Sequence, residues 1–192
     1  ETFHTAIQYL GYANRNKTYM GVGRNLGYKK SVFFENKGFA SHQHMMSGDD
    51  DLFIQEASAH KKVGFCFYTE SLMYSDAPLS FGKWVKQKIR HMSTSNEYQF
   101  IYKLMLGLYS FSQIIWFSSI VIFLLVYPSY WYTVIGFVFL KWLIQWVIFG
   151  KFALKINARK IIYFLPIYDI LYTFYLIIFG LIKPFLKPKT WN

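Results

Sequence analysis

Three long apolar runs in the second half of the chain limit the folds that it can adopt. They cover about residues 104–127, 130–149 and 161–182, and the first carries no charged side chain. About 20 apolar residues cross the hydrocarbon core of a bilayer as one helix. The sequence therefore predicts that residues 104–192 form a membrane region with two to three transmembrane helices.

The charge of this region indicates its surroundings and orientation. Residues 104–192 hold 8 Lys/Arg and one Asp, 8 − 1 = +7 of the chain's net +11. Because the region is so apolar, the lipid bilayer with its anionic headgroups is the expected partner, and nucleic acid is not. Basic segments prefer the cytoplasmic side. With residues 1–103 in the cytosol, the first span exits, the second returns, and the basic linker 150–160 lies inside.

The third apolar run leaves two topologies open. A full span would carry Lys183 outside, which the preference for cytoplasmic positive charge disfavours. Pro166 would kink a helix here, so the run could instead be re-entrant or interfacial. Asp169 has a functional role if it lies deep in the bilayer, where it needs a polar partner, and is ordinary if it lies at the interface.

Residues 1–78 are expected to form a soluble part that mixes helices and strands. Acids at the start of 50–62 and lysines at its end suit the helix dipole. The segments 65–68 and 71–74 have the composition of strands, and Cys66 is expected to be buried in the first. The aromatic side chains expected in the core are Phe33, Phe34 and Phe39.

An amphipathic helix is expected at the start of the connector, residues 79–103. On a helical wheel over 79–92 one face gathers Phe81, Val85, Ile89 and Met92, and the opposite face gathers Gln87, Arg90 and His91. A basic amphipathic helix just before a membrane span is typical of one lying in the lipid interface. The alternative is that the polar side chains only decorate a solvated face.

The segment 47–53 reads SGDDDLF, with three acids in a basic chain. Acids at a helix start are favourable in themselves, and the spacing does not match a calcium loop. His42 and His44 could bind a metal from one strand face, but no third ligand is near them in the sequence. We therefore assign no metal site within the chain.

The order of four motifs resembles the C-terminal half of membrane-anchored family 2 glycosyltransferases, inverting enzymes related to cellulose and hyaluronan synthases. The motifs are GVGRN at 21–25, NKGF at 36–39, SGDDDL at 47–52 and QKIRH at 87–91, followed by membrane spans. The resemblance implies an α/β fold, in which residues 1–78 are the C-terminal part of a GT-A catalytic domain. It also implies a bacterial inner-membrane protein that crosses the membrane several times, with this part in the cytosol.

The resemblance assigns roles to particular residues. Asp50, or Asp49 in the other register, would be the general base that takes a proton from the acceptor hydroxyl. Gln87 and Arg90 would bind the donor diphosphate and shape the acceptor site, and arginine suits phosphate oxygens. His91 stands where the family has tryptophan, so a stacking role is in doubt. On resemblance alone, the pocket is also lined by Arg24 and Asn25.

The implied partners are a nucleotide-sugar, expected to be a UDP-sugar, and a glycan or lipid-linked acceptor. The family uses a divalent cation, Mg or Mn, whose main DxD ligands are expected to lie outside this chain. Asp49-Asp50-Asp51 fits the form of DxD but follows a polar Ser-Gly and not an apolar strand. The chain begins at Glu1, so we expect a fragment or a processed chain without the donor-binding half.

A second function fits the apolar runs, Lys141 and Asp169. The chain would then be a non-catalytic membrane protein, such as a transporter subunit or a scaffold with a basic cytosolic domain.

Overall fold

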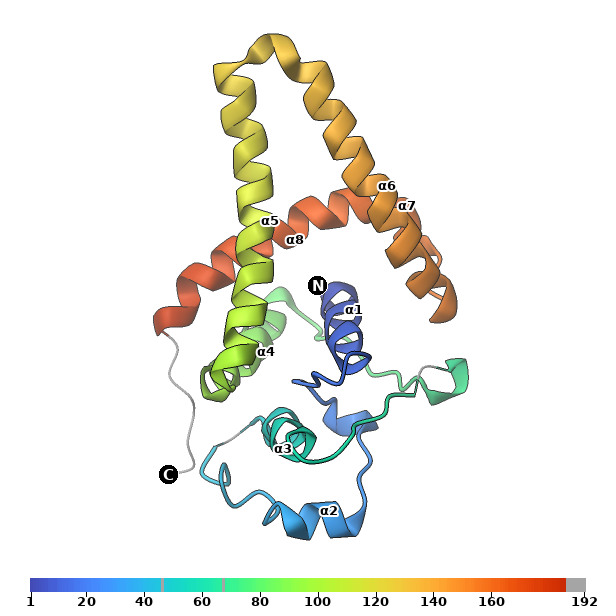
Figure 1. Ribbon diagram of the computed structural model, residues 1–192, viewed down its shortest axis with the longest axis vertical. Helices are drawn as coiled ribbons and strands as arrows, with labels where there is room; N and C mark the ends of the chain where they lie inside the picture. The colour runs from blue at the N-terminus through green and yellow to red at the C-terminus, as the bar shows by residue number, and fades with distance from the viewer. Residues whose placement is uncertain (46, 67, 186–192) are drawn as a thin grey trace. The chain divides into compact units, whose positions relative to one another are not determined.

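The computed structural model describes residues 1–45, 47–66 and 68–185 (Figure 1). The described residues are mostly helical. The α-helices are α1 (Thr2–Ala13), α2 (Lys30–Glu35), α3 (Asp49–Ser58), α4 (Phe81–Thr94), α5 (Phe100–Val126), α6 (Trp131–Lys155), α7 (Lys160–Tyr163) and α8 (Leu165–Ile182). The short 3₁₀ turns are η1 (Gly23–Asn25), η2 (Thr69–Ser71), η3 (Ser95–Glu97), η4 (Pro128–Tyr130) and η5 (Lys183–Phe185).

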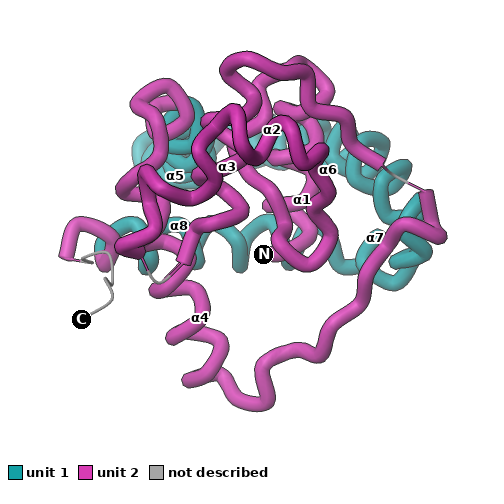
Figure 2. The backbone as a smooth tube through the Cα atoms, turned by 90° about the horizontal axis from the view of Figure 1, so that it is seen from below, with its two compact units in different colours: residues 1, 105–181 teal, residues 2–104, 182–192 magenta. Residues whose placement is uncertain are grey.

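The chain divides into two compact units, which Figure 2 colours separately. One unit holds Glu1 and Met105–Leu181, and the other holds Thr2–Leu104 with Ile182–Asn192. We call them the membrane unit and the soluble unit. The membrane unit contains most of α5, with α6, α7 and α8, and the soluble unit contains α1 to α4.

Three helical stretches are long and apolar enough to cross a membrane: Phe100–Val126, Pro128–Lys155 and Leu165–Phe185. They match the three apolar runs of the sequence. The third run is not one helix, because it breaks at Phe164 between α7 and α8. Pro166 explains the break, since proline has no backbone N–H for the preceding turn and its ring clashes with that turn.

The expectation of an α/β fold is not supported, because the described part of the chain contains no β-strand. Of the two expected strands, 65–68 and 71–74, the described residues are irregular or lie in η2. Ser71 Oγ donates to the Tyr68 carbonyl at 2.7 Å and accepts from the Tyr68 N–H at 3.2 Å, which holds a tight turn instead of an extended chain. Cys66 is exposed, so its expected burial is also wrong.

The core of the soluble unit forms around Phe53 of α3, whose exposed fraction is 1%. Its ring lies against Tyr28, Phe33 and Phe39, with ring centres 4.6 to 5.9 Å away. Phe33 and Phe39 are thus part of the core, as predicted. Phe34 is 64% exposed and is not.

The amphipathic segment forms α4, which starts two residues later than the predicted range. The hydroxyl of Ser80 accepts from the Lys83 N–H at 3.3 Å and caps the helix. Phe81 is strongly exposed at its start, while Ser93 and Thr94 are buried at its end. The helix therefore packs into the soluble unit by its C-terminal end.

Candidate functional site

The acidic helix start lies at the centre of the candidate site. Gly48 precedes α3 with a φ of 97°, a left-handed conformation that favours glycine. Asp49, Asp50 and Asp51 then fill the first turn, where the positive end of the helix dipole stabilises acids. This local arrangement fixes where the three carboxylates begin, but their surroundings differ.

The GVGRN loop closes over two of these carboxylates. The Gly23 N–H donates to Asp50 Oδ2 at 2.7 Å, and the Gly21 N–H donates to Asp51 Oδ1 at 3.2 Å. A Cβ on Gly21 would lie 3.2 Å from the Asp50 carbonyl, and a Cβ on Gly23 would lie 3.2 Å from Asp50 Oδ2. The glycines thus allow the close approach on which both hydrogen bonds depend.

The segment before the acids contacts the end of α4. Ser47 Oγ and Thr94 Oγ1 are 2.7 Å apart and share a hydrogen bond. A Cβ built on Gly48 would lie only 2.1 Å from Thr94 Cγ2, so no other residue fits there without movement. Three of the sequence motifs, GVGRN, SGDDD and the helix that carries QKIRH, therefore meet at the start of α3.

The other predicted site residues lie as follows. Asp49 is exposed and Asp50 is half-buried. On α4, Gln87 is half-buried, whereas Arg90 and His91 are exposed. No hydrogen bond described in the structure joins the side chains of Gln87 or Arg90 to these acids.

Arg24 and Asn25 contact a segment of their own unit. Arg24 Nη1 donates to Ser75 Oγ, and Asn25 Nδ2 donates to the Ser71 carbonyl at 2.9 Å. Both side chains thereby tie residues 71–75 to the GVGRN loop. Their expected pocket-lining role stays a prediction.

Sequence reasoning missed a role for Asp51 and its partner Tyr98. The Tyr98 hydroxyl donates to Asp51 Oδ2, and Tyr98 is 7% exposed. Burial raises the pKa of Asp51 to about 7, the neighbouring carboxylates add to this, and the hydrogen bonds from Tyr98 and Gly21 oppose it. The position of Asp51 in the first turn of α3 did not indicate its hydrogen bond to Tyr98, because Tyr98 lies 98 − 51 = 47 residues away in the sequence.

Gln55 was also missed, although it joins three segments of the soluble unit. Its Nε2 donates to the Tyr19 carbonyl at 2.8 Å, and its Oε1 accepts from the Gln99 N–H at 3.1 Å. The side chain is 2% exposed, so both groups are paired where water is excluded. A glutamine between apolar positions 54 and 57 was the available signal.

Asp51→Asn is expected to flatten the pH dependence of stability. A carboxyl whose folded pKa is raised stabilises the fold in its protonated form, so the contribution is lost as the pH rises from about 4 to about 7. Asparagine keeps an acceptor for Gly21 and offers Tyr98 a donor without titrating. The measurement is the thermal midpoint in detergent between pH 4.5 and 8, with exposed Asp76→Asn as the control. An unchanged slope in Asp51→Asn would contradict the assignment.

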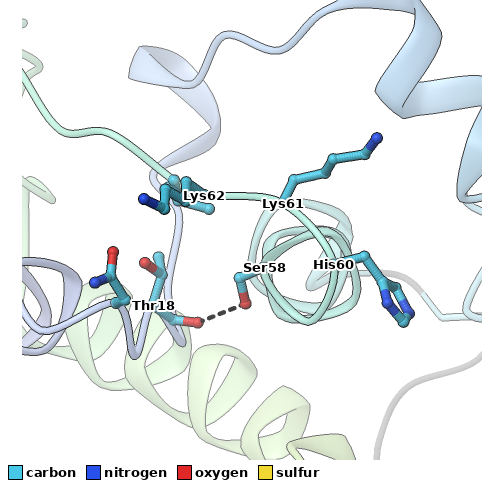
Figure 3. Close-up of a pocket in the computed structure, with 7 residues that line it drawn as sticks. Thr18, Ser58, His60, Lys61 and Lys62 are labelled. Carbon is cyan, nitrogen blue, oxygen red and sulfur yellow. Dashed lines mark hydrogen bonds between the residues drawn. The ribbon is translucent and has the colours of Figure 1, made fainter.

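Two pockets lie near the C-terminal end of α3, away from the acids. One, of about 290 Å³, is lined by Asn16, Thr18, Ser58, His60, Lys61, Lys62 and Val63, and Figure 3 shows the Ser58 hydroxyl donating to the Thr18 carbonyl. Lys61 forms an ion pair with Glu35 at 2.7 Å, and both side chains are about half exposed. The other, of about 600 Å³, is also lined by His60, with Ser41, Glu56 and Gln99 among its polar residues.

The described side chains do not fit a metal site. Residues 1–45, 47–66 and 68–185 contain no group of three or more His, Cys, Asp or Glu arranged to hold an ion. His42 Nδ1 lies 2.9 Å from Ser41 Oγ and 3.6 Å from Glu56 Oε1, and Ser41 Oγ donates to Glu56 at 2.6 Å.

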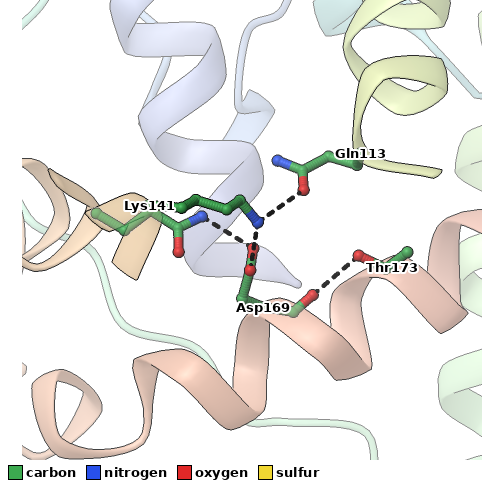
Figure 4. A network of polar contacts seen from close by, with 5 residues as sticks. Gln113, Lys141, Asp169 and Thr173 are labelled. Carbon is green, nitrogen blue, oxygen red and sulfur yellow. Dashed lines mark hydrogen bonds and ion pairs between the residues drawn. The ribbon is translucent and has the colours of Figure 1, made fainter. Parts of the chain in front are cut away.

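A second polar cluster lies inside the membrane unit (Figure 4). Asp169 of α8 is 1% exposed and forms an ion pair with Lys141 of α6. Lys141 Nζ also donates to Gln113 Oε1 of α5 at 3.3 Å, and Gln145 Nε2 donates to Asp169 Oδ1 at 2.9 Å. Lys141 Nζ lies 4.6 Å from the centre of the Phe117 ring. Asp169 thus has buried polar partners, whereas its depth in a bilayer stays a prediction.

Comparison with known proteins gave no match among protein-family models, curated proteins or solved structures.

Proposed function

We propose that this chain is the acceptor-side and membrane-side part of an inverting membrane glycosyltransferase. It would transfer a sugar from a nucleotide-sugar, such as a UDP-sugar, to a glycan or lipid-linked acceptor at the cytosolic face of a bacterial inner membrane. The observation that carries the proposal is the meeting of GVGRN, SGDDD and the end of α4 at one point. Residues 21–25 and the end of α4 are both far from α3 in the sequence. The apolar and basic composition of the chain does not by itself predict that these segments contact one another.

In this proposal the Asp50 carboxylate is the general base. It is half-buried, and the Gly23 N–H fixes one of its oxygens. Asp50 takes the proton of the acceptor hydroxyl while that oxygen forms a bond to the anomeric carbon. The bond from this carbon to the diphosphate breaks, and the nucleotide diphosphate leaves. A single displacement inverts the carbon, so one carboxylate suffices and no second is needed as a nucleophile.

Arg90 and Gln87 would serve the diphosphate. Arg90 is exposed on α4, so its guanidinium is open to a ligand, and guanidinium groups bind phosphate oxygens in pairs. Asp49 is the alternative base, since it is exposed in the same helix turn. Asp51 is a poorer base, because one of its oxygens accepts from the hydroxyl of the buried Tyr98 and is thereby closed to an acceptor hydroxyl.

The test is nucleotide release by membranes containing the natural full-length protein and its Asp50→Asn and Asp49→Asn variants. Loss of a general base lowers a rate by roughly 10² to 10⁴-fold, so we expect one of the two variants to lose at least about 10²-fold. Asp76→Asn is the matched control, because Asp76 is an exposed acid of the same unit. Normal turnover in both test variants would reject the role of this motif.

The Lys141–Asp169 pair favours a second candidate, a non-catalytic membrane protein such as a transporter subunit. Ionisable groups buried among membrane helices often mark the path of an ion or polar solute. This function makes the acids of α3 dispensable and the pair essential. Retained biological activity in Asp50→Asn and Asp49→Asn, together with its loss in Lys141→Met/Asp169→Leu, would support it over the transferase.

A further inference from the structure

The polar cluster lies near the middle of the hairpin formed by α5 and α6. Gln113 is 113 − 100 = 13 residues from one end of α5 and 126 − 113 = 13 from the other. Lys141 is 141 − 131 = 10 residues from the start of α6, which at 1.5 Å per residue is about 15 Å from the hairpin turn. The hydrocarbon core is about 30 Å thick. If the hairpin crosses the bilayer, the cluster lies at about half its depth.

Asp169 reaches this depth after a very short helical path. It is only 169 − 165 = 4 residues from the start of α8. Lys141, by contrast, is 155 − 141 = 14 residues from the end of α6, which is about 21 Å. If α8 were a full span antiparallel to α6, it would need about the same length of helix before Asp169 reached the depth of Lys141. Helix α8 therefore begins inside the apolar layer and not at its edge.

A backbone carbonyl beside the break between α7 and α8 is also hydrogen-bonded to α6. Pro166 has no N–H, so the Ile162 carbonyl loses the bond that a continuous helix would supply four residues on, and it accepts from a backbone N–H at the end of α7 instead. Trp146 Nε1 of α6 also donates to this carbonyl, at 3.0 Å. Backbone groups freed inside a bilayer must find protein partners, and Leu165 beside the break is 2% exposed. The break is thus equipped to lie below the membrane surface.

The direction of α8 completes the geometry. Ile162 of α7 contacts Trp146 of α6, and Asp169 of α8 contacts Gln145 and Lys141, so both segments approach α6 along residues 141–146. Figure 1 shows α8 running across the hairpin and away from the turn at η4. Beyond it, η5 packs against α4 within the soluble unit.

We infer that α7 and α8 form a re-entrant segment, so the chain crosses the membrane twice and the end of α8 returns to the side on which α5 begins and α6 ends. Lys183 then lies on the same side as the basic linker after α6. The Lys141–Asp169 pair and the Trp146 contact hold the segment at depth. This inference does not depend on the proposed catalytic activity.

Cysteine labelling tests the topology. Cys66→Ser removes the single cysteine, and Ser129→Cys, Lys151→Cys or Phe185→Cys then adds one exposed site. A membrane-impermeant maleimide is applied separately to sealed right-side-out vesicles and to sealed inside-out vesicles. Phe185→Cys is expected to be labelled from the same side as Lys151→Cys, and Ser129→Cys from the opposite side. Labelling of Phe185→Cys together with Ser129→Cys, or only after detergent, would overturn the inference.

A double-mutant comparison tests the break itself. Trp146→Phe removes the donor to Ile162 and is expected to lower the thermal midpoint in detergent. Pro166→Ala restores a backbone N–H, which gives the Ile162 carbonyl a helical partner. In that background the Trp146→Phe shift is expected to fall to less than half. Equal shifts in both backgrounds would show that the indole does not serve the broken helix, and the inference would lose this support.

Discussion

Gly48→Ala is expected to lower the free energy of unfolding of the soluble unit by about 2–6 kcal/mol, because two costs add. A left-handed conformation costs a residue with a Cβ roughly 1–3 kcal/mol, and overpacking a close contact costs a similar amount. The φ of Gly48 is 97°, and the new Cβ would lie 2.1 Å from Thr94 Cγ2 and 3.5 Å from Leu52 Cδ1. The thermal midpoint of the detergent-solubilised protein is the measurement.

Thr94→Ser separates the two costs. Serine lacks Cγ2 but keeps the hydroxyl that pairs with Ser47 Oγ. Gly48→Ala/Thr94→Ser should therefore recover the part of the loss due to the clash and keep the part due to φ. Gly82→Ala is the control, since nothing lies within 4 Å of its Cβ and alanine favours the helix. If Gly48→Ala is as harmless as Gly82→Ala, α3 and α4 do not pack as described.

Local signals in the sequence predicted most of the helices. The acid-rich start of α3 and the amphipathic pattern of α4 depend only on neighbouring residues, so a sequence displays them directly. The apolar runs likewise predicted α5 and α6, because length and hydropathy depend on no distant partner.

The prediction of strands was wrong because strand formation does depend on distant partners. A strand is stable only when a neighbour pairs its backbone groups, and strand composition does not show whether that neighbour exists. Residues 71–74 have β-like composition, yet the Ser71 hydroxyl bonds locally to Tyr68. Phe34 shows a similar limit, since successive residues of the short helix α2 face different directions and only Phe33 turns toward Phe53.

The candidate site was predictable as a set of motifs but not as a set of contacts. The sequence pointed to Asp50 and Asp49 through their position, whereas the carboxylate whose pKa is raised, to about 7, is Asp51. Its hydrogen bonds come from Tyr98 and Gly21, which come near it only through folding. Asp169 could likewise be recognised as unusual in an apolar run, but its partner Lys141 lies on another helix.

Asp169→Leu is expected to destabilise the membrane unit by about 3–5 kcal/mol, the usual cost of leaving one buried charge without its partner. The side chain of Asp169 is 2% exposed and that of Lys141 is 18% exposed, so water cannot replace the lost carboxylate. Gln113 offers Lys141 only a neutral acceptor at 3.3 Å. Lys141→Met is expected to have a similar effect, since it leaves the Asp169 carboxylate without a cation and with only the neutral Gln145 amide donating to it.

The double variant Lys141→Met/Asp169→Leu distinguishes lost pairing from lost packing. Replacing a whole buried ion pair by apolar residues of similar volume is often neutral, so the double variant should recover most of the loss. Lys151→Met is the control, because Lys151 is an exposed lysine near the end of the same helix. A double variant as unstable as Asp169→Leu would mean that the side chains contribute through packing, and that the ion pair is not what joins α8 to the hairpin. Recovery would show that the loss in Asp169→Leu comes from the unpaired lysine, and that the pair as a whole adds little net stability.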